Sequence, residues 1–223
     1  LTQGKTIEKF ENEIAKYVGA KYAVAVSSCT AGLHIAYKAA GVNDKNQIIT
    51  SPITFVSTPN ASLYEGSSFQ ISDIDSQTLN ICPDILKKNL KRFNTIKVIA
   101  PVHFGGLPCD ISNIKKIIKN KNIVIVEDAA HALGAKYKNG KMVGSCYASL
   151  MTVFSFHPVK IIASGEGGVV TTNDPSIYKQ LLRLRSHGVN KNTDILENKK
   201  YAYDKDNKKN IWYYEMQELG YNY

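Results

Sequence analysis

Apolar positions along the chain follow two alternating spacings, and this alternation predicts a fold of the α/β class. Segment 6–18 places its apolar residues at helical spacing and is followed by Gly19, which is typical of a helix end. The short apolar run at 22–26 is typical of a strand, and the turn after it leads into a second helical pattern that ends at Gly41. The first part of the chain therefore predicts a strand-turn-helix unit.

The same unit recurs through the first 127 residues. We predict strands at 22–26, 47–50, 68–71, 96–101 and 123–127, and helices at 6–18, 31–40, 55–64, 84–91 and 111–120. Strands that alternate with helices at this spacing indicate a mostly parallel sheet, because each crossover helix must return over a face of the sheet.

After Asp128 the pattern changes. Asn139 and Gly140, in the middle of 136–143, have the signature of a tight hairpin. We predict further strands at 149–154 and 168–172 and a helix at 175–185, which gives seven strands in one mixed sheet with helices on both faces. From 187 to 210 the apolar periodicity disappears, and this predicts a long exposed loop.

The composition is that of one globular domain. Of the 223 residues, 43% are hydrophobic and 21% are charged, and no apolar run approaches the roughly 20 residues that a membrane helix needs. We therefore expect no membrane span, no export signal and a cytoplasmic location. The four cysteines lack metal-binding spacing, so we expect free thiols and no metal site.

The net charge of +9 raises the question of a nucleic-acid partner. The lysines are scattered or lie in loops, and no basic stripe is interleaved with aromatic residues. We therefore expect no nucleic-acid partner. A solvated lysine-rich surface explains the charge, with attraction of a phosphate-bearing small substrate as the alternative.

A lysine and an aspartate carry the chemistry that we expect. Asp128 ends the apolar strand 123–127, and Lys160 follows the run 154–159 and precedes the Gly-rich stretch 164–168. A pyridoxal phosphate enzyme needs this pair, because the lysine holds the aldehyde as a Schiff base while the aspartate keeps the pyridine nitrogen protonated. The apolar residues beside Lys160 predict a sheltered amine. A structural alternative for Asp128 is the capping of a following helical turn.

Further candidates surround this pair. The turn at 28–31 opens a helix, where hydroxyls and backbone N–H groups suit a phosphate, although helix capping alone would also explain its Ser and Thr. Phe55 is a candidate for stacking on a flat ring, with a core aromatic as the alternative. His131 follows Asp128 closely enough to address the same ligand, Ser155 is placed to reach a phosphate, and His157 is expected to support the loop.

At these residues the chain resembles the DegT/DnrJ/EryC1/StrS sugar aminotransferases, a family of fold-type I pyridoxal phosphate enzymes. The matching segments are AVSSCTAGL at 25–33, SPITFVST at 51–58, EDAAHALG at 127–134, SFHPVK at 155–160, GEGG at 165–168 and RSHG at 185–188. The resemblance covers nearly the whole chain. It implies the large cofactor-binding domain of that fold, over residues 1–223, without the smaller C-terminal domain of relatives.

The resemblance also implies a role for each matching residue. The implied roles are the Schiff base for Lys160, the ring nitrogen contact for Asp128, stacking on the ring for Phe55, a place at the ring for His131, the phosphate for Thr30, Ala31 and Ser155, and reach into the neighbouring subunit's site for Asn222. A homodimer with a shared site follows from the last of these roles.

Within the family, segments 1–4 and 212–223 are most similar to enzymes that aminate C4 of a UDP-linked 4-keto-6-deoxy-N-acetylhexosamine in surface-sugar biosynthesis. Leu1, Thr2 and Ser28 would then face the nucleotide sugar. L-Glutamate, the usual family donor, would supply the amine. Flagellin glycosylation is one process that uses such sugars.

Other interpretations remain open. A different nucleotide-linked keto sugar is one, and a regulatory or binding protein or an inactive fragment on the same scaffold is another. A dehydratase of this fold uses histidine in place of the lysine, and Lys160 argues against it. A dinucleotide-dependent oxidoreductase is disfavoured because no Gly-x-Gly-x-x-Gly follows the first strand.

Overall fold

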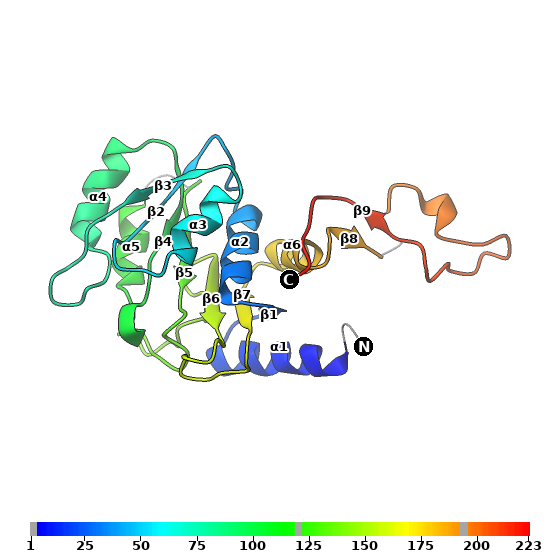
Figure 1. The fold of residues 1–223 in the computed structure, drawn as a ribbon, viewed down its shortest axis with the longest axis horizontal. Helices are drawn as coiled ribbons and strands as arrows, with labels where there is room; N and C mark the ends of the chain where they lie inside the picture. Colours follow the sequence, from blue (N-terminus) through cyan, green and yellow to red (C-terminus); the bar gives the residue numbers. More distant parts are fainter. Residues whose placement is uncertain (1–3, 119–121, 192–195) are drawn as a thin grey trace.

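The centre of the molecule is a seven-stranded sheet (Figure 1), and the computed structural model describes residues 4–118, 122–191 and 196–223. The strand order is β1-β7-β6-β5-β4-β2-β3. Only β7 runs antiparallel to its neighbours, which confirms the predicted mixed, mostly parallel sheet. The strands are β1 (Tyr22–Val26), β2 (Gln47–Thr50), β3 (Ser68–Ile71), β4 (Ile96–Ala100), β5 (Val124–Asp128), β6 (Met151–Ser155) and β7 (Gly168–Thr172).

Helices cover both faces of this sheet and bury two separate apolar clusters (Figure 1). The first layer is made by α1 (Lys5–Val18), α4 (Pro83–Arg92) and α5 (Ile111–Ile117), and the second by α2 (Cys29–Ala39), α3 (Ser57–Leu63) and α6 (Pro175–Arg185). Each helix was predicted within a few residues. The last two residues of the helix predicted at 111–120 lie outside the described residues.

Polar side chains fix where several helices begin. Ser28 accepts a hydrogen bond from the Ala31 amide at the start of α2, Asp110 accepts one at the start of α5, and Asp174 accepts two at the start of α6. Each side chain satisfies an amide that the first helical turn leaves without an intrahelical partner. These caps set the points at which the chain turns from a strand end into a helix.

Strand β5 shows how one strand serves both helical layers. Its side chains alternate between the two clusters, with Ile125 in the first and Val126 in the second. By the same alternation Glu127 lies with the α1, α4 and α5 layer, and Asp128 lies with the α2, α3 and α6 layer. Two consecutive carboxylates therefore leave the end of β5 on opposite faces of the sheet.

Residues 188–219 form an extension that we call the arm, and Figure 1 shows it projecting away from the sheet. It contains β8 (Val189–Asn190), a short 3-10 helix (Lys199–Tyr201) and β9 (Glu215–Met216), which pairs antiparallel with β8. The sequence predicted only an exposed loop at 187–210. The strand pair was missed because two-residue strands are too short to show a hydrophobic period.

The two ends of the arm meet at one place on the body. The His187 amide donates to the Tyr221 carbonyl, and the Tyr221 amide donates to the Leu184 carbonyl. Gly188 and Gly220 approach so closely that a Cβ on either one would overlap the other strand's backbone. The chain therefore leaves the body and returns to it through a junction that admits no side chain at either glycine.

Two tyrosines bind the C-terminal segment to α2 and to the turn that follows α3. Tyr221 donates from its hydroxyl to Glu65 at 2.8 Å, and the Tyr223 hydroxyl lies 2.8 Å from Nδ1 of His34. His34 and Lys38 also contact the Glu65 carboxylate, at 2.8 and 2.9 Å. These residues, which we call the joint, connect segments more than 150 positions apart in the sequence.

The hairpin at 136–143 is confirmed by an antiparallel bridge between Lys136 and Met142. All four cysteines are free, as expected. In the described part of the chain, no helix is long and apolar enough to cross a membrane.

Candidate functional site

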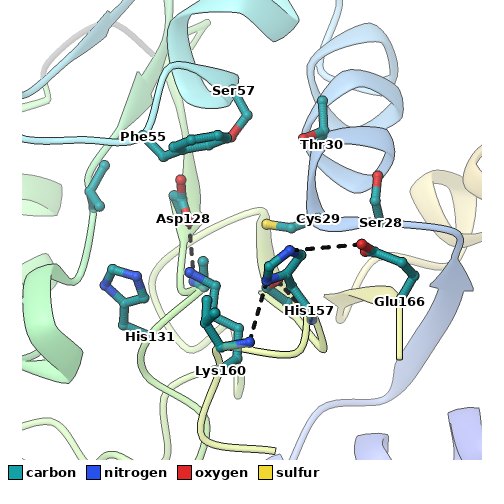
Figure 2. Close-up of a pocket in the computed structure, with 14 residues that line it drawn as sticks. Ser28, Cys29, Thr30, Phe55, Ser57, Asp128, His131, His157, Lys160 and Glu166 are labelled. Carbon is teal, nitrogen blue, oxygen red and sulfur yellow. Dashed lines mark hydrogen bonds and ion pairs between the residues drawn. The ribbon is translucent and has the colours of Figure 1, made fainter. Parts of the chain in front are cut away.

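The candidate site is a cavity of about 380 Å³ at the carboxyl ends of the parallel strands (Figure 2). Loops after β1, β2, β4, β5 and β6 converge there, as expected for ligand sites of open α/β sheets. The lining residues are Ser28, Cys29, Thr30, Phe55, Ser57, Val102, Asp128, Ala130, His131, Ser155, His157, Val159, Lys160 and Glu166. Residues from five separate sequence segments thus share one cavity.

Asp128 forms the buried floor of the cavity. Only 4% of it is exposed, and its Oδ2 accepts a hydrogen bond from the Thr58 hydroxyl at 2.6 Å. Its Oδ1 accepts from the Ala130 amide at 3.1 Å, so the capping role considered from the sequence is also present. These bonds fix the orientation of a carboxylate that would be costly to bury without partners.

Lys160 lies on the loop that follows β6 and reaches the same cavity (Figure 2). Its amide donates to the His157 carbonyl at 2.9 Å, which closes a tight turn. The prediction that its apolar neighbours shelter the amine is wrong, since Ile161 and Ile162 are 67% and 56% exposed. The loop runs over the rim of the sheet, so these side chains face outward while Lys160 is half-buried in the cavity.

The start of α2 forms another wall. Ser28, Thr30 and the β6-end residue Ser155 bring hydroxyls to the cavity, at the positive end of the helix dipole. Ala31 is buried and does not line the cavity, and its amide already donates to the Ser28 hydroxyl at 3.1 Å. The predicted capping by Ser28 is therefore present, and a phosphate at Ala31 would compete with it.

Gly168, at the start of β7, allows this wall to stand where it does. A Cβ there would lie 2.5 Å from the Ser28 carbonyl oxygen and 2.7 Å from the Cys29 nitrogen. Both neighbours are backbone atoms, which cannot swing aside as a flexible side chain would. The glycine therefore lets the start of α2 pack directly on β7.

Phe55 lies just before α3, two residues before the helix begins. It is 74% exposed, so the alternative of a core aromatic is wrong. Figure 2 shows its ring beside the Asp128 carboxylate. An exposed aromatic ring over a buried carboxylate leaves a slot that suits a flat ring with a protonated nitrogen.

The environment shifts the pKa values of two further titratable groups in the cavity, His131 and Cys29. Burial lowers the pKa of His131 below its usual value, and the positive charge of Lys160 acts in the same direction while Asp128 opposes it. The half-buried His131 imidazole is therefore favoured in its neutral form. Burial and the Asp128 charge raise the pKa of the Cys29 thiol well above its usual value, so this cysteine is a poor nucleophile.

His157 and Glu166 lie at the rim, with 3.8 Å between Nε2 and Oε1. The His157 Nδ1 also accepts from the Val159 amide at 3.4 Å, within the Lys160 loop. These contacts agree with the prediction that His157 supports the loop. Surface ion pairs of this kind contribute little to stability, so their effect is on the shape of the loop.

Besides Ala31, three predicted residues are not part of this cavity as the structure describes it. Asn222 is exposed and forms an isolated antiparallel β-bridge with Ser186, next to the joint. Leu1 and Thr2 lie outside the described residues. The predicted roles of all three stay predictions.

The cavity also contains residues that sequence reasoning did not select. Ser57 and Glu166 lie inside matching segments, at the start of α3 and in the Gly-rich stretch, so their positions carried a signal. Val102 follows β4 and shows nothing distinctive in the sequence. In the described part of the chain, no cluster of His, Cys, Asp and Glu is suited to a metal ion.

Behind the floor, Glu127 is the centre of a buried hydrogen-bond network. It is 1% exposed, and its Oε2 accepts from His103 Nε2 at 2.9 Å and from the Tyr137 hydroxyl at 2.5 Å. Its Oε1 accepts from the hydroxyls of Ser149 at 2.5 Å and Thr152 at 2.9 Å. Burial alone would raise the pKa of Glu127, but these donors hold it below its usual value.

Comparison with known proteins identifies relatives of the whole chain. The model of the DegT/DnrJ/EryC1/StrS aminotransferase family matches residues 1–223. The spore coat polysaccharide biosynthesis protein SpsC of Bacillus subtilis is 40% identical over 221 residues, covering 99% of this chain and 53% of SpsC. The UDP-4-amino-4,6-dideoxy-N-acetyl-beta-L-altrosamine transaminase of Campylobacter jejuni is 38% identical over 224 residues, covering 100% of this chain and 54% of the transaminase.

The similar solved structures are also aminotransferases. Helicobacter pylori PseC, an aminotransferase of pseudoaminic acid biosynthesis, superposes with a TM-score of 0.85 at 32% identity, covering 100% of this chain and 54% of PseC. The PLP form of the Streptococcus pneumoniae sugar aminotransferase Spr1654 gives a TM-score of 0.82 at 25% identity, covering 99% of this chain and 56% of Spr1654. The chain thus spans about half the length of the relatives it matches.

Proposed function

The chain belongs to the DegT/DnrJ/EryC1/StrS aminotransferase family, and we propose that it is the large domain of a pyridoxal phosphate-dependent aminotransferase for a nucleotide-linked keto sugar. The main support for this proposal is that Lys160 and Asp128, which are 32 positions apart in sequence, line the same cavity at the carboxyl ends of the strands. The relatives that cover the whole chain support the reaction class.

The residues present fit this cofactor. Asp128 is a buried carboxylate with one face to the cavity, which suits a protonated ring nitrogen, and Phe55 offers an exposed ring for stacking. The hydroxyls of Ser28, Thr30 and Ser155 gather at the start of α2, where a phosphate dianion is favoured. Lys160 supplies the amine that bonds the aldehyde.

The protein's own residues then direct the reaction. Pyridoxal phosphate supplies an electron sink that stabilises negative charge on the substrate carbon. Lys160 Nζ would take the proton from the substrate carbon and deliver it to the carbon that carried the aldehyde, and would carry it in the opposite direction in the other half-reaction, so one group would act as general base and general acid. Asp128 would hold the ring nitrogen in its charged form, and the neutral His131, which lines the same cavity, would add no second positive charge.

The substrate is a UDP-linked 4-keto-6-deoxy-N-acetylhexosamine, aminated at C4 with glutamate as the donor, in cytoplasmic synthesis of surface sugars. The transaminase activity of the Campylobacter relative and the biosynthetic role of Helicobacter PseC support a sugar of this class. Ser28, on the cavity wall, is a substrate contact together with Leu1 and Thr2. The excess of positive charge favours a substrate with a diphosphate.

The working unit is a homodimer with a shared site. Apolar side chains exposed on the arm support this proposal, because patches of this kind mark protein interfaces. The exposed residues are Tyr201, Tyr203, Ile211, Trp212, Tyr214, Met216 and Leu219. Asn222, next to the joint, is the residue that reaches the neighbouring subunit's site.

The proposal is tested by incubating the full-length protein with pyridoxal phosphate, L-glutamate and the 4-keto sugar nucleotide. The expected product is the 4-amino sugar nucleotide, identified by mass and NMR. Loss of the yellow colour on addition of glutamate alone distinguishes an aminotransferase from a binding protein on the same scaffold. A colour that persists, with no amino sugar formed, would falsify the proposed function.

A further inference from the structure

The network around Glu127 contains a proton whose position the structure fixes. The Cys109 amide donates to His103 Nδ1 at 2.9 Å, and an amide N–H cannot act as an acceptor. His103 Nδ1 must therefore carry a lone pair, and the ring proton is on Nε2, 2.9 Å from Glu127. An imidazole that accepts at one nitrogen and donates from the other is neutral. Burial lowers the pKa of His103 while its contacts with Cys109 and Glu127 raise it to about 10, but a second ring proton would have to lie on Nδ1, which faces the Cys109 N–H.

The charge of Glu127 consequently has no counter-ion in its own network. All four of its partners donate hydrogen bonds, two to each oxygen, and this arrangement stabilises an ionised carboxylate. Among the described residues, His103 is its only potential cationic partner within ion-pair distance. With His103 neutral, Glu127 is an isolated negative charge inside the protein.

This charge lies directly behind the candidate site. Glu127 and Asp128 are consecutive on β5 and point to opposite faces, so the backbone of a single strand separates them. The His103 amide donates to the Asp128 carbonyl at 3.0 Å, and this bond ties the two sides together. In the low-dielectric interior, a charge at this range is only weakly screened.

We propose that Glu127 is an electrostatic positioning residue, a second buried negative charge that favours the protonated form of a nitrogen base held over Asp128. This inference deepens the proposed function, on which it rests. Glu127 contacts no substrate or cofactor. It acts through the field that it adds to the Asp128 side of the cavity.

Other titratable groups also face this region, and their charges add to the field of Glu127 or oppose it. On the network side they are His103 after β4, Cys109 before α5, Tyr137 in the hairpin, and Cys146 and Tyr147 before β6. On the cavity side they are Cys29, Asp128, His131, His157, Lys160 and Glu166. Asp128 adds negative charge to that of Glu127, whereas Lys160 opposes it.

Two substitutions separate charge from shape. Glu127→Gln keeps the shape and removes the charge, whereas Glu127→Asp keeps the charge and shortens the side chain. The full-length protein is loaded with pyridoxal phosphate, and the absorbance of the lysine-bound cofactor is titrated with pH. Glu127→Gln is expected to lower the midpoint by on the order of one pH unit, and Glu127→Asp by much less. A merely structural role predicts the larger change for the shorter side chain, or equal changes for both.

Asp174→Asn is the matched control for loss of a carboxylate. Asp174 follows the carboxyl end of the antiparallel strand β7, so it lies at the rim of the sheet opposite the cavity. The control should leave the midpoint unchanged. A midpoint that is the same in Glu127→Gln and in the unsubstituted protein would overturn the proposal, because it would mean that His103 compensates the charge.

A second measurement does not need the cofactor or a folded variant. In the unsubstituted, ligand-free protein, the nitrogen chemical shifts of His103 should show a neutral ring protonated on Nε2 near pH 7. A doubly protonated ring would overturn the inference. If the protein fails to bind pyridoxal phosphate, the proposed function fails, and the NMR titration of His131 in Glu127→Gln still tests the field: its midpoint should fall.

Discussion

The sheet body and the arm bury their apolar residues to very different extents. In the body, two apolar clusters fill the space between the sheet and its helices, and side chains such as Leu33 and Ile125 are almost completely buried. In the arm, Trp212 is 82% exposed and Ile211 is 72% exposed. The body therefore completes its own core, whereas the arm offers apolar surface that a single chain does not cover.

Under the proposed function, this difference assigns the chemistry to the body and the association of subunits to the arm. The cavity is built by strand ends and helix starts whose positions are fixed by the core of the body. The arm adds little to that core and is attached through the joint, the narrow junction and an ion pair between Glu218 and Arg183 on α6. Changes in the body should therefore alter stability and chemistry, and changes in the arm should alter association.

The largest effect is expected from Lys160→Ala. The side chain lies in the cavity and its loop is exposed, so the substitution should abolish activity and the absorbance of the lysine-bound cofactor with little change in thermal stability. Absorbance spectra and thermal melts of the full-length protein check both expectations. Retained turnover would contradict the assignment of this lysine.

Gly168→Ala should cause the next largest change. The added Cβ would press on the backbone of Ser28 and Cys29, so the start of α2 must move away from β7. Overpacking of this kind costs about 1–3 kcal/mol, and the displaced hydroxyls should weaken phosphate binding as well. Denaturant unfolding measures the first effect, and titration with inorganic phosphate measures the second. The exposed Gly4, with open space around it, provides a matched Gly→Ala control.

The double substitution Ile211→Ser and Trp212→Ser tests the role of the arm. Both residues are exposed, so the stability of one chain should change by no more than about 0.5 kcal/mol per site. The dimer should instead dissociate at higher protein concentration, which analytical ultracentrifugation detects. Tyr17→Ser, at a position 57% exposed on α1, is the control on the body. An unchanged dimer would show that the arm is not part of the interface.

The order and type of the main elements could be predicted because their signals are local. The bounds predicted for β1, β5 and α1 from their apolar patterns agree with the observed bounds to within one residue. The grouping of Lys160 with Asp128 was also predictable, because both follow strands whose ends meet at one edge of the sheet. These inferences need only periodicity and topology.

Other features depend on long-range contacts that no local pattern encodes. The exposure of Ile161 and Ile162 follows from the path of their loop, and the joint connects His34 to Tyr223 across 189 positions. The Glu127 network draws its donors from His103, Tyr137, Ser149 and Thr152. The sequence identified Glu127 only as a neighbour of Asp128.

The smallest expected effect concerns the joint between body and arm at low pH. Burial lowers the pKa of His34, although Glu65 opposes this, and the Glu65 pKa is also below its usual value. A folded pKa below the unfolded value means that stabilisation is complete above the unfolded pKa, about 6.5 for His and 4.3 for Glu, and is lost as the pH falls further.

The protection factors of the amides at 221–223 should therefore fall between roughly pH 6.5 and 4, before those in the β5 core do. Tyr223→Phe removes one hydroxyl of the joint and should cost about 1 kcal/mol or less in local stability. Protection factors that fall equally in both regions would show that the joint is not a separate unit.

The narrow junction at Gly188 and Gly220 allows the arm to change in length during evolution without disturbing the sheet. Because the chain departs and returns at a single point, insertions and deletions beyond that point need not disturb any strand pairing in the sheet. The sheet body and the arm can therefore diverge at different rates. The two glycines themselves must stay, since any side chain there would force the two crossing backbones apart.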